Sequence, residues 1–145
     1  MIVRTILTGK PTSDVATTVA SQTVNDAVKL LAKWRIGAVV VVNEQQEIVG
    51  ILSERDVVRG MARYGAAVGE MLVGDLMTSE VLTCSSADTI ETLMSVMTNN
   101  RIRHLPVVEN GKLAGIITIG DVVKARLEET TMQVDSLREY VMSAH

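Results

Sequence analysis

The amino-acid sequence contains the same pattern twice. Arg35 aligns with Arg101, 66 residues further on, and Gly50 aligns with Gly115, 65 residues further on. Residues 50–56 read Gly-Ile-Leu-Ser-Glu-Arg-Asp, and residues 115–121 read Gly-Ile-Ile-Thr-Ile-Gly-Asp. An internal duplication of this kind constrains the architecture more than any other sequence feature. We therefore expect ligand chemistry to occur twice, or once in a cleft that both copies share.

The length predicts that the two copies pack on each other. A chain of 145 residues is ordinary for one compact domain. Copies of roughly 60 residues each would be marginally stable alone, because small domains bury a low fraction of their surface. Hydrophobic residues make up 47% of the chain, which is enough for a shared core.

Short apolar runs alternate with helical patterns, which predicts an α/β (α+β) fold of two tandem β-α-β-β-α repeats. We place the first repeat at 1–66 with its N-terminal segment, the second at 67–126, and a helical extension at 127–145. Residues 73–77 open the second repeat as residues 3–7 open the first. The predicted strands are 15–18, 38–42, 48–52, 81–84, 104–108 and 113–118, and the predicted helices are 23–36, 53–62, 89–100 and a long one from 119.

Two amphipathic patterns accompany these elements. In the helix from residue 23, the predicted apolar face is Val24, Ala27, Val28, Leu31 and Trp34. In the last helix, apolar residues alternate in steps of four and three from Val123 to Val141. This spacing is typical of a coiled-coil seam, and it equally fits an amphipathic helix that folds back on its own domain.

Composition argues against several function classes. The net charge is −3 and the pI near 5.4, and there are three aromatic residues in all, so neither a basic surface nor a base-stacking platform is expected. Cys84 is the only cysteine, which excludes an internal disulfide. Neither a signal peptide nor a membrane-spanning run is apparent. We expect a cytoplasmic protein with no nucleic-acid or membrane partner. His104 and His145 lack metal-ligand spacing, and no catalytic residues are predicted.

The strongest site signal is a hydroxyl followed three residues later by an acid, at Ser53 and Asp56 and again at Thr118 and Asp121. Each pair follows a predicted strand and opens a predicted helix. One interpretation is a helix capping box, although that motif prefers Glu or Gln to Asp. The other is a ligand site, because a helix N-terminus suits phosphate, and a carboxylate one turn on can accept hydrogen bonds from two ribose hydroxyls.

A cationic cluster precedes one predicted strand of the second copy: Arg101, Arg103 and His104, with Pro106 just beyond. Such a cluster would neutralise phosphate, and it would also suit the C-terminal end of a helix dipole. The first copy keeps Arg35 but has Gly and Ala where the second has Arg103 and His104. Arg55 is expected to compensate. The two clefts are therefore predicted to differ chemically, with binding in the first cleft in doubt.

At these residues the chain resembles a tandem pair of CBS domains, the modules named after cystathionine β-synthase. Residues 103–108 read Arg-His-Leu-Pro-Val-Val, similar to the strand of that family, and each copy ends in Gly, two apolar residues, Ser or Thr, and Asp three residues on. The resemblance covers essentially the whole chain. The long final helix is similar to that of small stand-alone bacterial members.

The resemblance implies a non-enzymatic sensor of adenine nucleotides. AMP is the first candidate ligand, and ADP, ATP, NAD(H) and S-adenosylmethionine are further ones. By position, Asp56 and Asp121 would hold ribose. Phosphate would be met by Ser53, Arg55, Thr118, Arg101, Arg103 and His104, and adenine would be enclosed by Ile36, Ile102, Val81 and Pro106.

The resemblance also implies how the chain assembles. CBS pairs commonly associate into a flat dimer, so a homodimer that acts on an unknown regulated protein is expected. The alternative is an interaction or dimerisation module in which the Ser/Thr and Asp pairs only cap helices. An enzyme, such as a nucleotide hydrolase, is a third possibility, but no nucleophile and base pair supports it.

Overall fold

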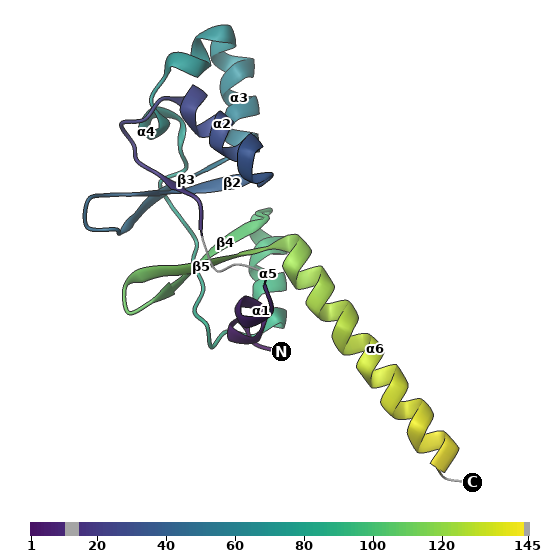
Figure 1. The fold of residues 1–145 in the computed structure, drawn as a ribbon. Coiled ribbons are helices and arrows are strands. Elements are labelled where there is room, and N and C mark those ends of the chain that lie inside the picture. Colours follow the sequence, from purple (N-terminus) through teal and green to yellow (C-terminus); the bar gives the residue numbers. More distant parts are fainter. Residues whose placement is uncertain (11–14, 144–145) are drawn as a thin grey trace.

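The computed structural model describes residues 1–10 and 15–143 and contains two small sheets with helices around them (Figure 1). Its mixed α+β repeats confirm the predicted fold class. The elements of the first part are α1 (Val3–Gly9), β1 (Thr17–Thr18), α2 (Val24–Trp34), β2 (Ala38–Val42), β3 (Ile48–Ser53), α3 (Glu54–Tyr64) and the 3-10 helix η1 (Gly65–Glu70). The remaining elements are α4 (Val73–Leu76), α5 (Ile90–Asn100), β4 (His104–Glu109), β5 (Lys112–Thr118) and α6 (Ile119–Ser143).

The two copies contain equivalent antiparallel hairpins. In the first, β2 pairs with β3, and β1 lies parallel to β2. In the second, β4 pairs with β5. All five residues of β2 are buried, which explains why this strand is a continuous apolar run rather than an alternating one.

The strand predicted at 81–84 is wrong. Within this segment, Cys84 pairs with β4 through an isolated parallel bridge to Val107. The reason lies a few residues earlier, where Thr78 pairs with Ile51 of the first sheet. The segment therefore crosses from one copy to the other and reaches β4 only at its end.

Each copy also contributes its first short helix to the core of the other copy. Val3 and Ile6 of α1 are buried in the cluster that contains residues of α5, β4 and β5. Val73 of α4 is buried in the cluster formed around α2, β2 and β3. Figure 1 shows α1 beside α5 and α4 beside α2. Neither cluster is complete without the other copy's segment, so the two copies form one folding unit.

Helices α2 and α5 begin and end in the same way. Thr23 and Thr89 cap their N-termini, each accepting a hydrogen bond from the backbone N–H three residues on. Arg35 and Arg101 end them in the left-handed conformation, with φ of 54° and 53°. That position usually holds Gly, because other residues pay a steric cost there. The predicted apolar face of α2 is only partly correct, since Val28 is 38% and Trp34 43% exposed.

Helix α6 extends away from both sheets (Figure 1). Val122 and Ala125 are its buried residues among those that the structure describes. The spaced apolar residues are exposed, for example Leu127 at 62% and Leu137 at 64%. Of the two interpretations of its apolar spacing, the one in which the helix folds back on its own domain is therefore wrong beyond the first turns.

Candidate ligand-binding cleft

A cleft of about 750 Å³ lies between the two copies. The first copy contributes the end of β3 and the first turns of α3. The second copy contributes the crossing segment 78–82 and the turn between α5 and β4. The lining residues are Gly37, Ile51, Ser53, Glu54, Arg55, Asp56, Arg59, Thr78, Glu80, Val81, Leu82, Asn100, Arg101, Ile102, Arg103 and His104.

Ser53 and Asp56 form a capping box at the start of α3. The Asp56 carboxylate accepts hydrogen bonds from the backbone N–H of Ser53 at 2.9 Å and from its hydroxyl at 3.1 Å. The backbone N–H of Asp56 donates in return to Ser53 Oγ at 3.3 Å. The capping interpretation is therefore confirmed as a local contact. Because the same two residues line the cleft, it does not remove them from a ligand's reach.

Thr78 completes the environment of Asp56 from the other copy. Its hydroxyl donates to Asp56 Oδ1 at 3.1 Å, while its backbone N–H and C=O pair with Ile51 at 2.9 Å each. Asp56 is only 9% exposed, so the edge of its carboxylate is what the cleft presents. Sequence reasoning missed Thr78 because nothing near it in the chain indicates that it meets a residue 22 positions earlier.

Four arginines line the cleft, Arg55 and Arg59 on α3 and Arg101 and Arg103 at the turn between α5 and β4. Arg55 donates from Nη1 to the backbone carbonyl of Arg101 at 2.8 Å, which ties α3 to the end of α5. Arg59 and Arg103 also line the cleft. Against these four arginines stand three acids, Glu54, Asp56 and Glu80. The arginine side chains therefore give the cleft a small positive excess, which suits an anionic ligand.

His104 packs against the first copy at Gly37. A Cβ added at position 37 would lie 3.0 Å from Cε1 and 3.1 Å from Nε2 of His104. Gly37 is the repeat equivalent of Arg103, so the difference between the copies makes room for an imidazole. Burial lowers the pKa of His104, and the charges of Arg103 and Arg55 lower it further against the opposite effects of Glu54 and Asp121. The imidazole is therefore neutral at pH 7.

The equivalent acid of the second copy has a different partner. Asp121 accepts from the backbone N–H of Thr118 at 2.9 Å, and its own N–H donates to Thr118 Oγ1 at 3.1 Å. Lys10 Nζ lies 2.8 Å from Asp121 Oδ2. Burial raises the pKa of Asp121, but the hydrogen bonds from Lys10 and Thr118 and the Lys10 charge outweigh it, and the net pKa is lowered.

The structure brings together eight of the twelve residues named from sequence: Ser53, Arg55, Asp56, Val81, Arg101, Ile102, Arg103 and His104. Thr118 and Asp121 lie outside this cleft. Pro106 is buried within β4, and Ile36 packs against the first copy's core. Neither is among the cleft's lining residues.

The structure corrects the expected difference between the two clefts. The sequence placed the cationic residues in the second copy and left binding in the first cleft in doubt. In the structure that cluster faces Asp56 across the copies. The physical reason is the crossing of segment 78–84, which brings the second copy's turn over the start of α3. The cleft of Asp56 is thus the cation-rich one.

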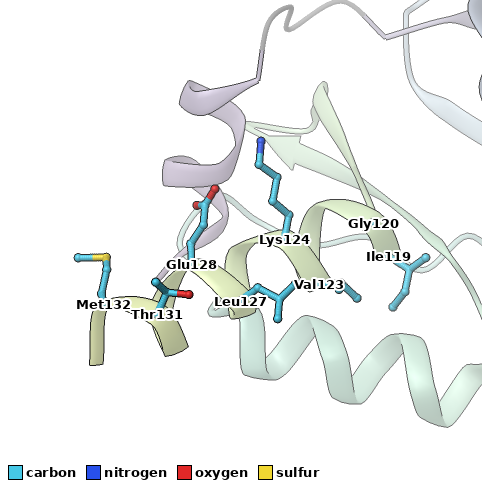
Figure 2. A pocket seen from close by; sticks show the side chains of 8 residues that line it. All are labelled: Ile119, Gly120, Val123, Lys124, Leu127, Glu128, Thr131 and Met132. Atoms are coloured by element: carbon cyan, nitrogen blue, oxygen red, sulfur yellow. The ribbon is translucent and has the colours of Figure 1, made fainter. Parts of the chain in front are cut away.

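A second hollow runs along the first half of α6 and is lined by residues of that helix alone (Figure 2). Its surface is mainly apolar, with Ile119, Val123, Leu127 and Met132 along it. It is an open face rather than an enclosed cavity, so it does not resemble a small-molecule site.

The structure also describes the surroundings of the other candidate residue types. Burial, with a smaller effect of Asp88, raises the pKa of Cys84 to about 12, so its thiol is protonated at neutral pH. Across residues 1–10 and 15–143, no three His, Cys, Asp or Glu side chains are placed to hold a metal ion. His145 lies outside the described residues. No helix in the described part of the chain is both long and apolar enough to cross a bilayer.

Comparison with known proteins shows the family of the chain. The CBS domain family matches residues 3–63 and again residues 73–128. The chain belongs to the CBS domain family. The CBS matches thus cover most of both copies, as the resemblance of the sequence predicted.

Individual relatives support the same assignment. A mitochondrial CBS domain-containing protein of Arabidopsis thaliana is 38% identical over 127 residues, covering 85% of this chain and 62% of the plant protein. The chain thus spans about three fifths of that relative's length. A CBS-domain-containing protein of Agrobacterium tumefaciens has a similar structure, with a TM-score of 0.83 and 44% identity over 86% of this chain and 92% of that one. Another solved CBS domain pair shares the fold at 22% identity, with a TM-score of 0.79 over 89% of this chain and 98% of that one.

Proposed function

We propose that this CBS pair binds an adenine nucleotide, with AMP as the first candidate, in the cleft between its two copies, and that occupancy regulates a partner protein. The observation that carries the proposal is the placement of Asp56 at a helix N-terminus opposite Arg101 and Arg103 of the other copy. One wall offers an acid for sugar hydroxyls, and the other offers cations for phosphate.

Asp56 would hold the ribose by exchanging its present partners. A carboxylate has about four acceptor positions, and Asp56 accepts from the Ser53 N–H, the Ser53 hydroxyl and the Thr78 hydroxyl. The two hydroxyls can rotate, so ribose hydroxyls can replace them while the backbone contact keeps the carboxylate oriented. The displaced Ser53 and Thr78 hydroxyls would then turn toward the ligand.

The phosphate and the base would contact different residues. Arginine forms bidentate bonds with phosphate oxygens, and Arg55, Arg101 and Arg103 line the cleft together. The neutral His104 would add a hydrogen bond rather than a charge. Val81 and Ile102 supply aliphatic surface for the adenine ring.

The solved pair of the same fold at 22% identity was crystallised with 5′-methylthioadenosine and S-adenosyl-L-methionine. Both compounds contain an adenosine unit. That observation belongs to the other protein, and it supports the choice of an adenosine-containing ligand here. We infer a regulatory rather than an enzymatic role, because the groups that line the cleft suit the binding of an anionic ligand with hydroxyl groups.

The proposal requires that the two copies can pack in two arrangements. A ligand shifts the equilibrium between them only when it binds one arrangement more tightly than the other. The Arg55–Arg101 bond crosses the cleft, so a phosphate that engages either residue would bias that arrangement. A partner protein would recognise the difference. Ligand binding would thereby change the surface that the partner protein contacts.

Thermal unfolding with added AMP tests the proposal. At 100 times its Kd, AMP should stabilise the protein by about 2.7 kcal/mol. Asp56→Ala should remove that stabilisation. The matched control is Asp75→Ala, because Asp75 caps α4 by accepting from the Leu72 N–H and does not line the cleft. Equal stabilisation of the Asp56 variant, or no stabilisation of the unmodified protein by any adenine nucleotide, would reject the proposal.

A second candidate function, an interaction or dimerisation module independent of nucleotide, is favoured by the exposed apolar face of α6 (Figure 2). Under this alternative, truncation after Arg126 abolishes a homodimer or partner complex and leaves nucleotide binding intact. Sedimentation of the full and truncated chains measures the first, and calorimetry measures the second. An unchanged oligomeric state would argue against α6 as the dimerisation element.

A further inference from the structure

The equivalent acids of the two copies, Asp56 and Asp121, accept hydrogen bonds from different kinds of donor. Asp56 accepts from the Thr78 hydroxyl at 3.1 Å, whereas Asp121 accepts from the Lys10 ammonium at 2.8 Å. Both acids otherwise accept from the backbone N–H three residues before them at 2.9 Å. The difference between the two positions therefore includes a neutral hydroxyl in one and a cation in the other.

Thr8 is the residue that occupies in the first copy the place of Thr78 in the second, since each follows the equivalent segments 3–7 and 73–77. Helix α4 stops at Leu76, so Thr78 lies beyond it and reaches the neighbouring copy. Helix α1 continues to Gly9, and the Thr8 hydroxyl donates back to the carbonyl of Arg4 at 2.8 Å. Thr8 is thus held within its own helix, and Lys10 takes its role.

Lys10 replaces both donors that Thr78 provides. The Thr78 backbone N–H donates to the carbonyl of Ile51 at 2.9 Å, and Lys10 Nζ donates to the carbonyl of Ile116 at 3.1 Å. Ile116 is the repeat equivalent of Ile51, 65 residues on. One ammonium group therefore satisfies the strand carbonyl and the acid together.

The bond between Lys10 and Asp121 should resist displacement by a ligand. A bond between an ammonium and a carboxylate is charge-assisted and stronger than one from a neutral hydroxyl. The Lys10 and Asp121 side chains are 24% and 22% exposed, so solvent screens the pair less than it would a surface pair. A ribose hydroxyl at Asp121 would have to displace a cation that is anchored at two acceptors.

We propose that Lys10 is a specificity-determining residue that occupies Asp121 as a built-in cation, so that each chain binds its first nucleotide at Asp56 while Asp121 stays closed to ribose. This inference rests on the nucleotide binding proposed above. It assigns unequal roles to two positions that the sequence repeat presents as equivalent.

Calorimetric titration of AMP into the full chain tests the inference. The unmodified protein should show one binding event per chain, and Asp56→Ala should remove it. Lys10→Met keeps the aliphatic stem and removes the donors, so it should add a second binding event that the unmodified protein lacks. Thr8→Ala is the matched control and should behave as the unmodified protein.

The reciprocal variant Thr78→Lys should weaken the first event by about tenfold, and it serves even where Lys10→Met fails to fold. A single unchanged event in Lys10→Met, or an unchanged first event in Thr78→Lys, overturns the role of Lys10 alone. Two binding events in the unmodified protein also overturn it, because Asp121 would then be open to ribose with Lys10 in place. No AMP binding to any of the proteins overturns the proposed function, and this inference with it.

Discussion

Arg55 donates a hydrogen bond from Nη1 to the backbone carbonyl of Arg101 at 2.8 Å. Arg55 belongs to the first turn of α3, and Arg101 is the left-handed residue that ends α5. The bond therefore joins the two walls of the cleft at a backbone position with φ of 53°. Strained residues of this kind persist where the surrounding structure holds them, and they concentrate at functional sites.

Removing this link should weaken ligand binding more than it weakens the fold. Arg55→Ala deletes a bond to a carbonyl and a cation from the cleft, and bonds from charged donors are worth about 1.5–3 kcal/mol. We expect the AMP affinity to fall by about tenfold or more in calorimetry. Arg63→Ala, on the last turn of the same helix and outside the cleft, is the control. Equal affinities for the two variants would exclude a role for Arg55.

The contact between Gly37 and His104 predicts a compensating pair of substitutions. Gly37→Ala places a methyl group 3.0 Å from the imidazole, and overpacking of this kind costs about 1–3 kcal/mol. His104→Ala in the same chain should relieve the clash. A double-mutant cycle by urea unfolding should therefore show a coupling of about 0.5 kcal/mol or more. Strict additivity would mean that the two residues do not touch in solution.

His104 also predicts how stability depends on pH. Burial lowers its pKa in the folded protein below the ordinary value of 6.5, with Arg103 and Arg55 acting in the same direction and Glu54 and Asp121 opposing them. The unfolded chain therefore binds the proton more readily, so this contribution to stability is complete above pH 6.5 and is lost as the pH falls below it. Urea unfolding between pH 8 and pH 5.5 measures the effect.

The matched variant for this pH series is His104→Gln, which cannot titrate. Its stability should change less over the same range than that of the unmodified protein. Identical pH profiles for the two proteins would show that another group, rather than His104, causes the loss.

Cys84 should be unreactive in the folded state. Its pKa of about 12 leaves almost no thiolate at pH 8, and its side chain is buried. A thiol reagent such as 5,5′-dithiobis(2-nitrobenzoic acid) should react with the native protein only as fast as it unfolds, and quickly in 6 M guanidinium. Rapid reaction of the native protein would contradict the buried placement of Cys84.

Much of the fold could be predicted from the sequence because its signals are local. Strand β2 has the bounds of the predicted apolar run 38–42, and α2 and α5 begin one residue after the predicted helix starts at 23 and 89. The long last helix was also expected. The prediction of a strand at 81–84 failed because this segment follows Thr78, which pairs with Ile51 of the other copy. No local sequence pattern encodes such a long-range pairing.

The site could be predicted in its residues but not in its grouping. Ser53, Asp56, Arg101 and Arg103 were all identified from their types and spacing. The sequence left open whether the two copies share a cleft, and it did not show that α1 and α4 are each buried in the other copy's core. That exchange brings the cations of one copy to the acid of the other, and it also places Lys10 on Asp121.

The most direct test is a crystal structure of the protein grown with saturating AMP. The account predicts one nucleotide between the copies, with its ribose hydroxyls on Asp56 and its phosphate against Arg101 and Arg103. An empty cleft at saturation, or AMP bound away from Asp56, would contradict it.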